Sequence, residues 1–368
     1  MKPILSLILV VFMVIVLSAC QTVAPAPAPP TAIQEVFTVT PRPVLPTRQP
    51  SATPAPSATP QPTEMVAPTA DSCPNGDCIT ACFKKLPQIV NPGDAKAKSG
   101  IRSIESEDGI TLVTYTINGD QPENPVEGTD LPEWLKPFQQ DQSSQTKVWD
   151  YFAALIPADQ RTYLAEYRVF SDGPDNNLAS VVQTETDMTK WALELDILDA
   201  ANPQDLTISL LHEFAHLLAL NPAQVVPSKP IFDNPDSDSV YQSEWDACQT
   251  YFPGEGCSLP DSYINQFYDR FWIEIEPEWE SLDAIESEED YQAALERFYE
   301  KYQAQFVDDY AVTDPSEDFA ETFSVFIREP QPTGQSIAEQ KVLFFYEFPE
   351  LVKLRSQIGH NLCAQLTK

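Results

Sequence analysis

The sequence predicts an α+β fold in which a small mixed sheet is followed by a mostly helical C-terminal half. Two patterns support this class. Short apolar segments with alternating polarity, bounded by turn residues, occupy much of residues 110–197. Beyond residue 200, apolar side chains recur at helical spacing behind good capping residues. Without the N-terminal segments, about 290 residues remain, which is enough for one large domain or for a small and a medium one.

The expected elements follow one another in a simple order. A strand near residues 110–117 and a Pro-rich connector lead to a helix near residues 144–156. Three further strands, separated by turns such as Asp172-Gly173-Pro174, are expected near residues 162–170, 179–184 and 190–197. Later helices are expected near residues 261–276, 288–308, 316–327 and 336–357. We expect the strand at 191–197 to be an edge strand that binds an extended peptide.

A helix between these two halves is the best-defined element. Asn202 is a good N-cap, Pro203 suits the first helical position, and Asn221-Pro222 ends the helix. Apolar side chains cover nearly all of its faces, and Glu213 is its only charged residue between positions 206 and 220. The sequence therefore predicts a buried helix with an acid that needs a compensating cation or partner.

This helix carries the motif H-E-x-x-H at His212, Glu213 and His216. Histidines four positions apart share one helix face and can bind one zinc ion, while the intervening Glu can deprotonate a metal-activated water. The motif also occurs by chance, and the alternative is a helix with two partly buried histidines and a solvated acid.

A third ligand is expected from a later helix. Catalytic zinc usually takes three protein ligands and leaves one position for water. Pro315 can open a helix behind Asp314, which places Glu317 and Glu321 four apart on one face. We expect Glu317 to bind the metal and Glu321 to orient one of the histidines. The alternative is an ordinary acidic amphipathic helix.

These two segments, H-E-F-A-H and S-E-D-F-A-E-T-F, resemble the gluzincin metallopeptidases, most closely the branch of the anthrax lethal factor catalytic domain. The resemblance spans roughly residues 147–346 and implies a zincin-like fold, Glu213 as general base and Glu317 as ligand. It also implies that Tyr310, seven residues before Glu317, stabilises the oxyanion, although Tyr310 can equally be a core residue. Asp318 departs from the aromatic residue usual in the family. The long spacing between the motifs requires an insertion near residues 221–275.

Two other groups offer alternative metal ligands. His360, the remaining histidine, can replace Glu317 as the third zinc ligand. Asp233, Asp236 and Asp238 lie in the insertion and offer oxygen ligands for calcium, although their spacing does not match an EF-hand loop. A plain solvated loop is the favoured explanation of these three residues.

The N-terminus resembles a bacterial lipoprotein signal. Residues 4–16 are apolar, and Leu17-Ser18-Ala19-Cys20 looks like a lipobox. The expected organisation is a signal peptide at 1–19, lipidated Cys20 with a Pro-rich disordered tether at 20–70, a Cys-containing segment with a short strand at 71–135, and the metallopeptidase-like domain at 136–368. The tether from residue 21 to residue 70 holds 13 of the 35 prolines, a composition that favours extended polyproline II. An uncleaved N-terminal anchor is the alternative.

Six cysteines remain after Cys20, and an even number in an exported protein indicates disulfides. Cys248 and Cys257 are expected to pair, and one of Cys73, Cys78 and Cys82 can reach Cys363. A metal cluster formed by those first three cysteines is the alternative, although they lack a C-x-x-C pair.

The net charge of −33 excludes a nucleic-acid partner and flat binding to an anionic membrane.

Taken together, the motifs and the N-terminal signal predict a surface-tethered, zinc-dependent endopeptidase that is exported and lipid-anchored to the bacterial cell envelope. Its expected cofactor is Zn²⁺, its partner a peptide or protein substrate, and its state a monomer. The alternative is a non-catalytic envelope lipoprotein that binds cell-wall material or another protein.

Overall fold

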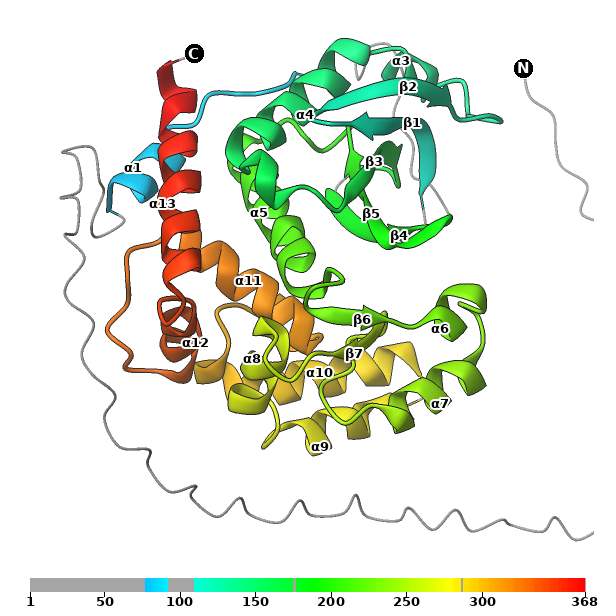
Figure 1. Ribbon diagram of the computed structural model, residues 1–368. Helices are drawn as coiled ribbons and strands as arrows, with labels where there is room; N and C mark the ends of the chain where they lie inside the picture. The colour runs from blue at the N-terminus through cyan, green and yellow to red at the C-terminus, as the bar shows by residue number, and fades with distance from the viewer. Residues whose placement is uncertain (1–76, 92–108, 175–176, 286, 368) are drawn as a thin grey trace, which may run out of the picture. The chain divides into compact units, whose positions relative to one another are not determined.

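The computed structural model describes residues 77–91, 109–174, 177–285 and 287–367, all within one compact unit that spans residues 66–368 (Figure 1). The lipobox, Cys20, the Pro-rich tether and Cys73 lie outside the described residues. Within the described ranges, none of the helices combines the length and the apolar character that crossing a bilayer requires.

A five-stranded mixed sheet forms one half of the unit, with the order β2-β1-β3-β5-β4 (Figure 1). All neighbours are antiparallel except β3 and β5, which are parallel. The strands are β1 (Ile110–Asn118), β2 (Gln121–Glu127), β3 (Leu164–Ser171), β4 (Ala179–Thr184) and β5 (Asp187–Asp196). This mixed sheet followed by helices is the α+β class that the sequence predicts.

The strand expected to be an edge lies inside the sheet. β5 pairs with β3 on one side and with β4 on the other, so its backbone groups are already used. The two edge strands of this sheet are β2, which pairs only with β1, and β4, which pairs only with β5. The prediction was wrong because alternation reveals which faces of a strand are buried but not the order of strands in a sheet.

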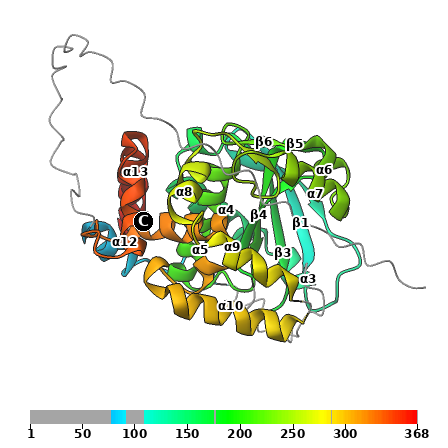
Figure 2. The ribbon, with the colours of Figure 1, turned by 90° about the horizontal axis from the view of Figure 1, so that it is seen from below.

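Two helices cover one side of this sheet, α4 (Gln142–Leu155) and α5 (Pro203–Leu220) (Figures 1 and 2). Trp149 of α4 packs against Tyr167 of β3 with ring centroids 5.4 Å apart. The hydroxyl of Tyr115 on β1 donates to Gln145 Oε1 at 2.6 Å, which satisfies two buried polar groups. These contacts fix α4 on the sheet and leave α5 between the sheet and the helical half.

The helical half packs against the far side of α5. The helix that packs most extensively on α5 is α11 (Pro315–Arg328), which also packs on α12 (Ile337–Phe345) and α13 (Pro349–Ala364). The sequence predicts one helix over 336–357, but two are present, because Pro349 lacks the N–H that a continuous helix would need. The remaining helices are α1 (Asp77–Phe83), α3 (Lys136–Gln139), α8 (Tyr263–Phe271), α9 (Glu276–Trp279) and α10 (Glu288–Tyr302).

The segment between the two motifs has secondary structure of its own. It contains a two-stranded ribbon, β6 (Val225–Pro227) with β7 (Gly256–Ser258), and the helices α6 (Lys229–Asp233) and α7 (Asp238–Ala247). The Cys248–Cys257 disulfide closes the loop that leads into β7. A second disulfide, Cys82–Cys363, ties α1 to α13, as expected for one of the three early cysteines. Cys78 is disulfide-bonded too.

Candidate metal centre

The motif helix forms as its sequence predicts. The side chain of Asn202 accepts hydrogen bonds from the N–H groups of Gln204 and Asp205, and Pro203 occupies the first turn. The centre of α5 is buried between the sheet and α11, and this burial includes His212, Glu213 and His216, each between 7% and 8% exposed. Polar side chains so deeply buried need specific partners.

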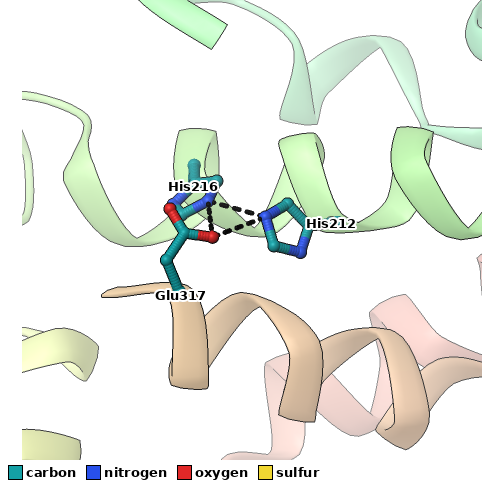
Figure 3. Close-up of side chains that lie close together, drawn as sticks. All are labelled: His212, His216 and Glu317. Carbon is teal, nitrogen blue, oxygen red and sulfur yellow. Dashed lines mark hydrogen bonds and ion pairs between the residues drawn. The ribbon is translucent and has the colours of Figure 1, made fainter. Parts of the chain in front are cut away.

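Three side chains from α5 and α11 point toward one another (Figure 3). Nε2 of His212 lies 3.0 Å from Nε2 of His216. Oε2 of Glu317 lies 2.9 Å from the first nitrogen and 3.4 Å from the second. Ligand atoms bound tetrahedrally to zinc at its usual bond lengths are separated by roughly 3.3 Å, so the observed triangle has the size of a zinc ligand set.

The directions of these contacts also fit a metal. Oε2 of Glu317 is buried and has no partner in hydrogen-bond geometry, although two imidazole nitrogens lie within 3.4 Å of it. The three atoms lie within 3.4 Å of one another, so they can share one ion. Two neutral imidazoles and one carboxylate are a typical ligand set for catalytic zinc, and they leave a coordination position open for water. Among the described residues, they form the one such set of His, Cys, Asp and Glu side chains.

Glu321 supports the ligand set from behind. One turn beyond Glu317 on α11, its Oε1 lies 2.9 Å from Nδ1 of His212, the nitrogen that faces away from Glu317. Burial would lower the pKa of His212, but the interactions with Glu317 and Glu321 and the charge of Glu213 raise it to about 10. Burial likewise opposes ionisation of Glu317, yet the two histidines hold its pKa well below the usual range. The metal-free site therefore favours a carboxylate beside a cation.

Glu213 lies between the sheet and the ligands. Its carboxylate accepts a hydrogen bond from the backbone N–H of Val181 on the edge strand β4. Burial raises the pKa of Glu213 to about 7, against the opposing influence of the two histidines and the Val181 N–H. A carboxylate with this pKa is suited to exchange protons near neutral pH.

Tyr310 lies beside the ligands and is not part of the core. Its ring centroid is 6.0 Å from that of His212, and its side chain is among the exposed large ones, at 52%. Burial of the hydroxyl and the nearby charges of Glu317, Glu213 and Glu321 raise its pKa, so it remains a hydrogen-bond donor. The short turn Tyr310–Val312 that carries it comes directly before α11.

Asp318 has a structural role in the core next to Glu317. It points into the core, where its Oδ2 accepts hydrogen bonds from Lys341 Nζ at 2.5 Å and from Trp272 Nε1 at 2.7 Å. Both charged side chains are fully buried. The ammonium of Lys341 also lies 4.1 Å from the centroid of Phe306, a favourable cation–π distance. This pair fixes α11 to α8 and α12 next to the ligand Glu317.

The inserted segment reaches the start of α11. Tyr251, inside the loop closed by Cys248 and Cys257, donates its hydroxyl hydrogen to Asp314 Oδ1 at 3.1 Å. The same oxygen accepts from the N–H of Ser316 at 2.7 Å and caps the helix. The loop therefore anchors the turn that begins the third-ligand helix.

The other candidate ligands lie elsewhere. His360 is on α13, away from the set formed by α5 and α11. Asp233 pairs with Lys229 at 2.8 Å, and Asp238 begins α7. Val181 could not be predicted from the sequence, because it contributes through its backbone and because the order of the strands was not predictable.

Comparison with known proteins yields one match. A family model described as "Putative zinc-binding metallo-peptidase" matches residues 268–337, which include Tyr310, Glu317 and Glu321 but not His212 or His216. No curated protein and no solved structure matches the chain. The matched segment supplies one side of the site and the motif helix supplies the other. Together, the family match and the ligand cluster support a zinc metallopeptidase.

Proposed function

We propose that this protein is a zinc-dependent endopeptidase of the gluzincin type, exported and anchored to the outside of the cell by a lipid on Cys20. The observation that carries the enzymatic part is the convergence of His212, His216 and Glu317, with Glu213 from the same helix beside them. When bound, zinc supplies Lewis-acid activation of water and of a peptide carbonyl.

Glu213 is the general base of this proposal. It accepts a proton from the attacking water and later returns it to the leaving amine. The N–H of Val181 fixes the carboxylate, and burial keeps its pKa close to neutral. Glu321 holds the His212 ring in one orientation by accepting the proton of Nδ1, which leaves Nε2 free for the metal.

Tyr310 stabilises the charge that develops on the substrate. Water attack converts the peptide carbonyl into an oxyanion, and the phenol donates a hydrogen bond to it. Its exposure allows access to a bound peptide, and its raised pKa keeps the hydroxyl protonated at neutral pH.

We propose that the backbone of the substrate binds along the edge strand β4. The N–H of Val181 points away from β5, toward Glu213. Backbone groups alternate in direction along a strand, so those of Ala179 and Gln183 share the outward direction of Val181. They can pair with an extended peptide and align it beside the ligands.

The location rests on the sequence. The lipobox ending at Cys20 favours export and lipidation, and the Pro-rich segment up to residue 70 favours a tether that extends the domain at 136–368 away from the membrane. The segment at 71–135 supplies cysteines and the first strands. Two disulfides in the described part are consistent with an oxidising compartment.

The test uses the full-length, zinc-loaded protein and a broad library of quenched fluorescent peptides. Glu213→Gln should retain zinc and lose about 10²-fold or more in rate, because the general base is removed and the ligands are not. Glu300→Gln, an exposed acid on α10, is the matched control and should behave like the parent. A zinc-loaded parent that cleaves no peptide, or a Glu213→Gln variant as fast as the parent, would overturn the proposal.

A further inference from the structure

Asp308 lies between the turn that carries Tyr310 and Glu321 of α11, and the roles proposed for the ligands and for Glu213 do not involve it. It lies just before the turn Tyr310–Val312 and is half-buried. Its Oδ1 accepts a hydrogen bond from the N–H of Ala311 at 3.0 Å. Thr313 closes the other side of the turn, since its hydroxyl donates to the carbonyl of Tyr310 at 2.8 Å. The carboxylate of Asp308 therefore fixes the backbone that presents Tyr310.

The same side chain also forms a hydrogen bond with Glu321. Two carboxyl groups can form such a bond only when they share a proton. Oε1 of Glu321 lies 2.9 Å from Nδ1 of the imidazole of His212, so Glu321 faces a nitrogen donor and acts as an acceptor. The shared proton is therefore assigned to Asp308, which donates to Glu321.

These contacts connect Asp308 both to His212, through Glu321, and to the turn that carries Tyr310. Glu321 reaches His212 Nδ1 at 2.9 Å, and the ring of His212 lies 6.0 Å from that of Tyr310. Asp308 contacts the turn that carries Tyr310 and the acid that orients His212.

We propose that Asp308 is a positioning residue that couples the orientation of the ligand His212, through Glu321, to the placement of Tyr310. It holds both groups through hydrogen bonds and does not touch the substrate or the reacting atoms. The part that concerns Tyr310 rests on the proposed peptidase function, whereas the part that concerns His212 depends only on metal binding.

The neighbouring residue provides a matched control. Asp309 has the same side chain and charge but is exposed and makes no side-chain hydrogen bond to the turn. Asp308→Ala removes both bonds of Asp308, whereas Asp309→Ala removes only a nearby charge. Asp308→Asn keeps both bonds in principle, because its amide donates to Glu321 and its oxygen accepts from Ala311.

The experiment measures two quantities on the full-length protein. The first is zinc affinity, by competition with a chromophoric chelator, which requires no substrate. The second is kcat and KM on a cleaved peptide. Asp308→Ala should weaken zinc binding and lower kcat by about tenfold or more each, with KM changed less, as for other residues that orient metal ligands. Asp308→Asn and Asp309→Ala should stay close to the parent. Asp308→Leu replaces the alanine variant if that variant does not fold.

Either of two results would overturn the proposal: Asp308→Ala matching Asp309→Ala in zinc affinity, or a folded Asp308→Asn losing as much as Asp308→Ala. A zinc-loaded parent that cleaves nothing would instead defeat the peptidase function, and the zinc affinities would still decide the role of Asp308 behind His212.

Discussion

Oε1 of Glu321 lies 2.9 Å from Nδ1 of His212, on the side of the imidazole ring opposite the nitrogen that approaches Glu317. With zinc bound, a carboxylate in this position would favour the tautomer in which Nδ1 carries the proton and Nε2 keeps its lone pair for the metal. One turn of α11 therefore supplies both a candidate ligand, Glu317, and the carboxylate that faces another candidate ligand, His212.

Replacing Glu321 should weaken the site without removing a ligand. Glu321→Ala leaves the Nδ1 proton of His212 without its acceptor, so zinc affinity or activity should fall by about 10–100-fold. Glu321→Gln should lose less, because its amide oxygen can still accept this proton. Chelator competition measures the affinities, with Glu300→Gln as the exposed control. Equal zinc affinity in the alanine variant and the parent would remove the orienting role from Glu321.

Zinc binding should depend on pH in a defined direction. In the metal-free protein the pKa of His212 is about 10, so the imidazole is protonated at neutral pH, while the lowered pKa of Glu317 keeps that carboxylate ionised. Zinc must therefore displace a proton from His212. Below the pKa of His212, the zinc association constant should therefore increase about tenfold for each unit by which the pH is raised, as one displaced proton requires.

Calorimetry in buffers of different ionisation enthalpy measures this proton directly. The account predicts release of at least one proton per zinc at neutral pH. Zinc uptake with no proton release, and with an affinity that does not change with pH, would mean that His212 is neutral in the metal-free site.

The candidate ligand residues could be placed on common helix faces from the sequence because helix periodicity is a local property. The spacing of four between His212 and His216, and again between Glu317 and Glu321, places each pair on one helix face. The sequence does not reveal which segment approaches β4, so the Val181 hydrogen bond to Glu213 was not predicted. Asp308 gave no signal either, because its two partners come from different elements.

In the fold, too, the elements marked by local patterns could be predicted, whereas the features set by long-range pairing could not. β4 and α5 were expected within a few residues of their bounds, since alternation and capping mark them. β2 was assigned to a connector because Pro122 and Pro125 lie inside it, and proline is compatible with the edge strand that β2 forms. The order of strands depends on long-range pairing, which places β5 inside the sheet and β4 at its edge.

The buried pair of Asp318 and Lys341 should matter strongly for stability. Lys341→Met leaves Asp318 in the core without its cation, and such a loss typically costs about 3–5 kcal/mol in the free energy of unfolding. Replacing both residues, with Asp318→Asn and Lys341→Met together, should cost less than the single change. Chemical denaturation of the full-length protein measures each free energy.

Lys229 offers the comparison on the surface. It pairs with Asp233 at 2.8 Å, but both side chains are largely exposed, so Lys229→Met should change the free energy of unfolding far less. If Lys229→Met and Lys341→Met were equally stable, the buried pair would not stabilise α11 as proposed.

The measurement that most directly tests the central claim is the zinc content of the full-length protein beside that of Glu317→Gln, both folded, oxidised and dialysed after zinc loading. The account predicts about one zinc per chain in the parent, held by three protein ligands, and a large loss in the variant. A parent that binds no zinc even after zinc is added back, or a Glu317→Gln variant that retains as much as the parent, would contradict it.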